Sequence, residues 1–124
     1  MTELCRIENA ALWVEFNSSG AEMKKIFSKV LGRELLWPGD AHVWSRSAPV
    51  LFPIVGKLVD NEYSYQGKTY SMNQHGFARD TSFSYEIKAA DEIDFVMSAT
   101  QATFVSYPFC FELRINYKLE ENTL

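Results

Sequence analysis

The sequence predicts an all-β protein built as an antiparallel β-sandwich. Three observations predict this class: short segments alternate apolar and polar residues, turn residues separate these segments, and aromatic residues, which favour strands, make up 15% of the chain. The chain shows no internal repeat and no linker composition. We therefore expect a single domain over residues 1–124, long enough to bury a hydrophobic core.

The first third of the chain predicts four short strands. They cover residues 4–9, 11–17, 21–29 and 33–37. The second strand carries apolar residues at every other position, so one of its faces should be buried. The third segment would also suit a helix by propensity. The glycines on either side of it allow both structures, and we predict a strand.

The apolar run Pro49 to Val55 predicts a strand that is bent or lies near a sheet edge, because prolines bracket its centre. A hairpin should follow, with Gln66-Gly67 as its turn. Alternating segments over 81–88, 93–97 and 109–119 predict three more strands. The last has the clearest pattern of the chain, with one face apolar and the other polar, as in an antiparallel sheet with one buried side.

Composition and charge exclude several classes of protein. The net charge is −4, whereas nucleic-acid binding requires clustered basic residues. No apolar stretch reaches the roughly 20 residues of a membrane span. The N-terminal residues lack the pattern of a signal peptide, which predicts a cytoplasmic protein.

Cys5 and Cys110 belong to no ligand or redox motif, so we expect two free and mostly buried thiols, and no metal site.

The most specific chemistry lies between residues 48 and 80. His75 can exchange a proton or bond a sugar oxygen near neutral pH, and its alternative is a loop histidine bonded to backbone. Arg79 suits a hydroxyl, a carboxylate or a phosphate, or else an ion pair with Asp80. Phe77 and Trp44 would offer flat apolar surface to a sugar, although such aromatic residues more often lie in the core.

The motifs APVLFPIVGKL, YSYQGKTYSM and QHGFARD together resemble the aldose 1-epimerase (galactose mutarotase) family, in the branch that reads HGFAR. The upstream Gly-Ala-Glu at 20–22 and the Trp-Pro-Gly-Asp turn at 37–40 are also similar to that branch. The resemblance implies a mutarotase-like supersandwich, of which this chain would be the N-terminal part. It implies an isomerase that interconverts the α and β anomers of a hexose without a cofactor.

The resemblance also implies roles for individual residues. His75 matches a substrate-binding histidine of the family, and we expect it to be catalytic and to bind the sugar. Lys57 lies where the family commonly has a sugar-contacting arginine, and Arg79 and Phe77 complete the expected substrate-binding set. The family's glutamate base and acid histidine fall beyond the end of this chain, so we expect it to lack them.

Several alternatives remain open. The sugar would be a hexose or a hexose 6-phosphate, the latter favoured by the charges of Lys57 and Arg79. A second possibility is a non-catalytic carbohydrate-binding module, and a third is a truncated gene product without a function of its own. Because the last strand has no following partner in the sequence, we also expect self-association through exposed strand edges.

Overall fold

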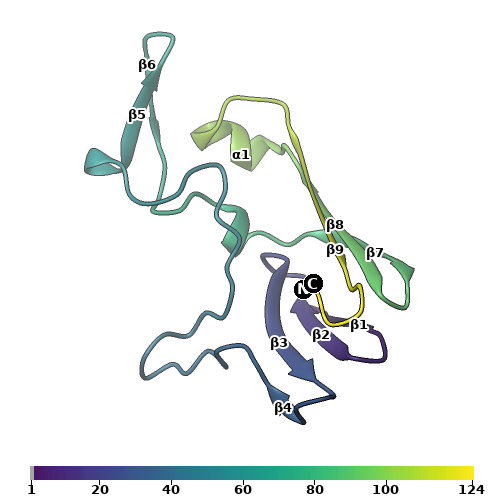
Figure 1. The fold of residues 1–124 in the computed structure, drawn as a ribbon. Coiled ribbons are helices and arrows are strands. Elements are labelled where there is room, and N and C mark those ends of the chain that lie inside the picture. The colour runs from purple at the N-terminus through teal and green to yellow at the C-terminus, as the bar shows by residue number, and fades with distance from the viewer. Residues whose placement is uncertain (1) are drawn as a thin grey trace.

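The computed structural model describes residues 2–124 as two facing antiparallel sheets and a separate hairpin (Figure 1). The first sheet contains β1 (Leu4–Glu8), β2 (Leu12–Asn17), β3 (Glu22–Ser28) and β4 (Arg33–Glu34), in that order. The second contains β7 (Ser84–Ala89), β8 (Glu92–Ser98) and β9 (Glu112–Lys118), and the hairpin pairs β5 (Glu62–Tyr65) with β6 (Lys68–Ser71). The predicted all-β class and the antiparallel sandwich are confirmed.

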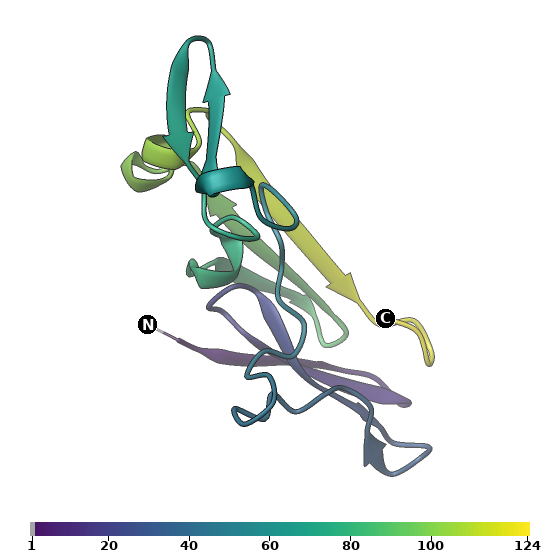
Figure 2. The same cartoon turned by 90° about the vertical axis from the view of Figure 1, so that its left-hand side faces the viewer.

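The helical content is small. It comprises α1 (Gln101–Ser106) and two 3₁₀ turns, Val59–Asn61 and Ala78–Asp80. The hairpin β5–β6 projects at the same end of the sandwich as α1 (Figure 2), and the Tyr63 hydroxyl donates to the Ser106 carbonyl over 2.7 Å. Within residues 2–124, no helix has the length and apolarity needed to cross a membrane.

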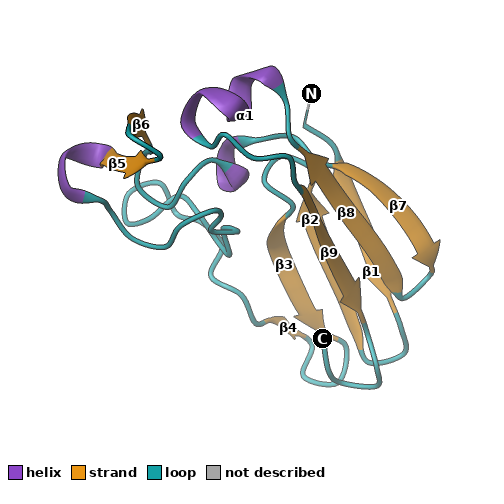
Figure 3. Ribbon diagram, turned by 90° about the horizontal axis from the view of Figure 1, so that it is seen from above, coloured by secondary structure: helices purple, strands orange, loops and turns teal. Residues whose placement is uncertain are grey.

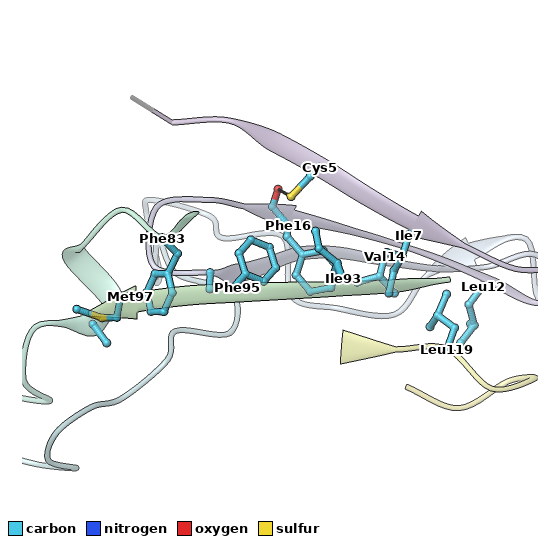
Figure 4. Close-up of a cluster of buried hydrophobic side chains, with 12 residues drawn as sticks. Cys5, Ile7, Leu12, Val14, Phe16, Phe83, Ile93, Phe95, Met97 and Leu119 are labelled. Carbon is cyan, nitrogen blue, oxygen red and sulfur yellow. Dashed lines mark hydrogen bonds between the residues drawn. The ribbon is translucent and has the colours of Figure 1, made fainter. Parts of the chain in front are cut away.

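The core lies between the two sheets. Phe16 of β2 is fully buried and contacts Phe95 of β8 and Tyr117 of β9, with ring centroids 5.4 and 4.6 Å apart. Figure 4 shows Phe16 and Phe95 within one cluster of buried hydrophobic side chains. The predicted alternation in β2 is confirmed, because Leu12 and Val14 are buried on the same face.

One side of the sandwich is closed by hydrogen bonds between the sheets. The Glu8 amide donates to the Ala90 carbonyl over 2.8 Å, and the Phe83 amide donates to the Ser18 carbonyl over 2.9 Å. The other side is open: β4 and β9 end their sheets there (Figure 3), and no strand of residues 2–124 pairs with the outer edge of either.

Two predicted strands are wrong in extent. The run Pro49 to Val55 lies outside the three sheets and forms an isolated bridge from Phe52 to Gly76. Its two prolines have no N–H to donate to a ladder, which explains why no strand forms. The fourth strand is β4 alone, because the chain turns away where the indole of Trp37 donates to the Trp44 carbonyl over 2.8 Å.

Two other local predictions are confirmed and one is partly wrong. The segment 21–29 contains the strand β3 and not a helix. The turn of the β5–β6 hairpin holds Gln66 and Gly67 at φ 48° and 76°, the left-handed pair that a tight two-residue hairpin turn requires. Both cysteines are free, but only Cys5 is buried. Cys110 is exposed, so the prediction of burial is wrong for it.

Candidate functional site

The candidate site is built on the loop of residues 72–80, which follows the hairpin and contains the HGFARD motif. His75 and Gly76 are both left-handed, with φ of 65° and 73°. A Cβ on Gly76 would lie 2.2 Å from the Phe52 carbonyl oxygen, so only glycine fits there. That carbonyl also accepts the amides of Phe77 and Ala78, at 3.0 and 3.2 Å. The segment 49–55, which does not form the predicted strand, therefore supports this loop through the Phe52 carbonyl.

His75 is held by two hydrogen bonds to Gly56. The His75 amide donates to the Gly56 carbonyl over 2.8 Å, and the Gly56 amide donates to His75 Nδ1 over 2.8 Å. An Nδ1 that accepts a hydrogen bond carries no proton, so the neutral ring carries its proton on Nε2. The half-buried ring therefore presents its Nε2–H as a donor. The alternative prediction, a loop histidine bonded to backbone, holds for Nδ1, which accepts the Gly56 amide.

Lys57 lies beside His75 because it directly follows Gly56. Its side chain is exposed. Arg79 belongs to the same loop, and its Nη2 donates to the Gln74 carbonyl over 3.2 Å. The structure therefore brings Lys57, His75 and Arg79 to one region, although they are up to 22 positions apart in the sequence. All three present N–H donors, a set that suits hydroxyl, carboxylate or phosphate oxygens.

Arg79 belongs to a cluster of charged residues that also contains Asp80, Arg46 and Glu22. Asp80 contacts Arg79 Nε at 3.7 Å and forms a short ion pair with Arg46, whose Nη1 donates to the Arg79 carbonyl over 3.0 Å. Arg46 also lies 3.7 Å from the buried carboxylate of Glu22. The expected pair of Arg79 with Asp80 is present, but Asp80 is shared between two guanidinium groups.

Glu22 anchors this cluster to the sandwich. Its Oε1 accepts the amides of Ser47 and Ala48, at 2.7 and 3.1 Å, and the residue is only 4% exposed. Glu22 and Arg46 are not among the site residues that the sequence predicts. The Gly-Ala-Glu motif that ends at Glu22 is the one signal for them, and it does not indicate which residues the carboxylate contacts.

Phe77 packs inward. Its ring lies 6.1 Å from Phe52, 6.2 Å from Tyr107 and 6.0 Å from Phe111, in a cluster that borders the core. These contacts favour its role as a packing residue over that of a sugar-stacking face. Trp44 is half exposed on the 37–44 loop, so it is not the core residue that its type predicts.

An apolar hollow of about 260 Å³ lies beside the loop. It is lined by Pro53, Ile54, Leu58, Tyr63, Met72 and Tyr107. Lys57, His75 and Arg79 are not among its lining residues. Burial raises the pKa of the Tyr63 phenol, because an apolar environment disfavours its charged form. Among residues 2–124, no group of three or more His, Cys, Asp or Glu side chains is arranged to hold a metal ion.

Comparison with known proteins gives consistent matches along almost the entire chain. The family model described as Aldose 1-epimerase matches residues 3–124. The relative called Protein LacX, plasmid, from Lactococcus lactis subsp. lactis is 30% identical over 123 residues, which are 95% of this chain and 41% of that protein.

Solved structures agree with that match. A galactose mutarotase related enzyme from Lactobacillus acidophilus has a TM-score of 0.92 and 42% identity, covering 98% of this chain and 40% of that one. A galactose mutarotase-like protein from Lactobacillus casei ATCC 334 has a TM-score of 0.92 and 34% identity, covering 96% of this chain and 40% of that one. The chain spans about two fifths of the length of these relatives.

Proposed function

Because this chain belongs to the aldose 1-epimerase family, we propose that it supplies the sugar-orienting part of a site that interconverts the α and β anomers of a hexose. The observation that carries the proposal is the hydrogen bond of 2.8 Å from the Gly56 amide to His75 Nδ1. That bond leaves Nε2–H as the donor that a sugar oxygen would meet. The anomerisation itself is proposed for a whole protein of the relatives' length.

The donors around His75 supply the binding. The Nε2 atoms of Gln74 and His75 lie 3.4 Å apart, and both carry hydrogen in this tautomer, so one sugar oxygen placed between them would accept from both. Lys57, which directly follows Gly56 and is exposed, would offer its ammonium group to a neighbouring hydroxyl. Arg79 would hold a more distant oxygen through its guanidinium group.

The reaction needs two proton transfers. A base removes the proton of the C1 hydroxyl and an acid protonates the ring oxygen. The ring then opens, the C1–C2 bond rotates, and the ring closes on its other face. We assign no base to this chain, because Asp80 already pairs with Arg46 and Arg79. The proposal gives His75 the role of orienting the sugar and assigns both proton transfers to groups outside the chain.

A hexose 6-phosphate is the second candidate substrate, and the charge balance around the loop favours it. The carboxylates of the cluster are Glu22 and Asp80, and the cations near them are Lys24, Arg46 and Arg79. These three cations outnumber the two carboxylates. A phosphate group would meet this excess of positive charge.

Two measurements on the purified chain test the proposal. Calorimetric titration with D-galactose, D-glucose and their 6-phosphates measures binding, and polarimetry of freshly dissolved α-anomers measures mutarotation. The test variant is His75→Ala, and the control is His42→Ala, which removes the other histidine from an exposed loop. We expect sugar binding that His75→Ala weakens about tenfold, the loss of one good hydrogen bond, and that His42→Ala leaves unchanged.

The outcomes separate the candidate functions. Binding without faster mutarotation supports an orienting role, as in a carbohydrate-binding module or one part of an enzyme. Tighter binding of the 6-phosphates that Arg79→Gln abolishes would select the phosphorylated substrate. A chain that binds no hexose and no hexose phosphate at millimolar concentrations would overturn the proposal.

A further inference from the structure

Both flanks of Arg79 are fixed by backbone hydrogen bonds. On the N-terminal side, the Phe77 amide donates to the Phe52 carbonyl over 3.0 Å. On the C-terminal side, the Gly20 amide donates to the Thr81 carbonyl over 2.7 Å. These bonds set the path of the chain at Arg79, but they do not decide what its guanidinium group contacts.

The guanidinium group of Arg79 carries one unsatisfied donor. Its Nε is buried and has no hydrogen-bond partner within residues 2–124. Asp80 Oδ2 lies 3.7 Å from that Nε, which is too far for a hydrogen bond. Because an unsatisfied buried donor is costly, a carboxylate so close to it would normally move in and accept its proton. Another contact must therefore hold the Asp80 carboxylate away from Arg79.

Arg46 provides that contact. Its Nη2 pairs with Asp80 Oδ1, and its Nη1 donates to the Arg79 carbonyl over 3.0 Å. One planar guanidinium group thus holds both a carboxylate and the backbone of the preceding residue, a use of the arginine fork that a lysine ammonium does not match. Arg46 is in turn oriented by the buried Glu22, whose Oε2 lies 3.7 Å from its Nη1.

We propose that Arg46 is a positioning residue, which holds the Asp80 carboxylate away from Arg79 and so keeps the Nη groups of Arg79 available to the sugar. The role rests on the function proposed above, in which Arg79 holds a sugar oxygen. Without Arg46, the Asp80 carboxylate would turn and accept from Nε and one Nη of Arg79 together, the bidentate arrangement that arginine and carboxylate favour. Since Arg79 Nη2 already donates to the Gln74 carbonyl over 3.2 Å, few donors would remain for a hydroxyl group.

The Nε–H signal of Arg79 in proton–nitrogen spectra of the purified chain reports the contact with Asp80 directly. It is assigned by its loss in Arg79→Gln. We expect Arg46→Gln to move the proton signal downfield, because Asp80 then accepts a charge-assisted hydrogen bond from Nε. The double variant Arg46→Gln/Asp80→Asn should return the signal toward its parent position, because the carboxylate is then absent.

Calorimetric titration of the same variants with D-galactose measures the consequence for the sugar. This sugar is neutral, so a change in the net charge of the site does not by itself alter its affinity. We expect Arg46→Gln to raise the dissociation constant about tenfold, the loss of one good hydrogen bond, and the double variant to restore it to within about threefold of the parent. Arg33→Gln removes an exposed guanidinium group of β4 and is the matched control, which should change neither readout.

Thermal unfolding of each variant verifies that it folds. If Arg46→Gln does not fold, Arg46→Lys takes its place. That variant keeps the positive charge that faces Glu22 but lacks the fork, so it should show the same changes at smaller size.

An Arg79 Nε–H signal that does not move in Arg46→Gln would overturn the inference. So would unchanged D-galactose binding, or a loss of binding that the double variant does not restore, which is the result expected of a residue that only stabilises the fold. A parent chain that binds no D-galactose would count against the proposed function instead, and the Nε–H signal would still decide whether Arg46 holds Asp80 away from Arg79.

Discussion

Two hydrogen bonds between Gly56 and His75 join two segments that the β5–β6 hairpin separates. The Gly56 amide donates to His75 Nδ1 over 2.8 Å, and the His75 amide donates to the Gly56 carbonyl over 2.8 Å. The first bond sets the tautomer of the ring and the second sets the position of the backbone. Because Lys57 directly follows Gly56, the same two hydrogen bonds also fix the position of the Lys57 backbone.

Gly76 should be far less tolerant of substitution than Gly67. Gly76→Ala adds a Cβ 2.2 Å from the Phe52 carbonyl oxygen at φ +73°, whereas Gly67 has a similar φ of +76° and no atom within 4 Å of its Cβ position. We expect Gly67→Ala to cost about 1 kcal/mol, from backbone strain alone. Gly76→Ala should cost about 3 kcal/mol or more, because the loop must also leave Phe52.

Urea denaturation of the two variants measures this difference. Equal losses in the free energy of unfolding would mean that the 72–80 loop does not rest on the Phe52 carbonyl. That result would contradict the support we describe for the candidate site.

Glu22 should contribute much more to stability than an exposed glutamate of the same sheet. Glu22→Ala leaves two backbone amides near position 47 without their acceptor and removes a carboxylate that faces Arg46. We expect a loss of about 3 kcal/mol. Glu34→Ala breaks only an exposed ion pair with Lys25 at 3.8 Å and should cost less than about 0.5 kcal/mol.

Chemical denaturation at neutral pH gives both free energies. Hydrogen exchange of the Ser47 and Ala48 amides adds a local readout, since both should lose protection in Glu22→Ala and keep it in Glu34→Ala. Unchanged protection in Glu22→Ala would show that the carboxylate is not their acceptor.

Cys5 should make the fold less stable at high pH. Burial, with smaller contributions from Glu3 and Glu15, raises the pKa of its thiol from 9.0 to about 11. The unfolded chain therefore loses this proton first as pH rises, so the free energy of unfolding should fall between about pH 9 and 11. Cys5→Ala should reduce the slope without abolishing it, because burial also raises the pKa of Tyr117.

Melting temperatures of the parent and of Cys5→Ala from pH 8 to 11 measure this effect. Parallel curves for the two proteins would contradict a raised thiol pKa. Cys110→Ala is the control, since Cys110 is exposed.

Periodic features could be predicted from the sequence, and features that join distant polar residues could not. The alternation of β2 and β9 identifies the inward faces, because one-sided burial imposes a period of two on each strand. The run Pro49 to Val55 misled the prediction because its apolar residues indicate burial, while its prolines prevent strand pairing.

The candidate site shows the same division. The QHGFARD motif led to His75 and Arg79, but the acceptor role of Nδ1 depends on the amide of Gly56, 19 positions earlier. The ion pair of Glu22 with Arg46 likewise joins a charged residue of β3 to a charged residue of a connecting loop. No local pattern encodes these contacts, since they depend on how the loops lie over the sheets.

The ¹⁵N spectrum of the His75 imidazole, assigned by its loss in His75→Ala, tests the tautomer and the sugar contact together when it is recorded at about pH 8, where an ordinary imidazole is neutral, before and after addition of D-galactose or its 6-phosphate. We predict an unprotonated Nδ1, a proton on Nε2, and a shift of the Nε2 signal on sugar addition, with His42 unaffected. A proton on Nδ1, or an Nε2 signal that no sugar perturbs, would show that His75 does not orient the sugar through Nε2.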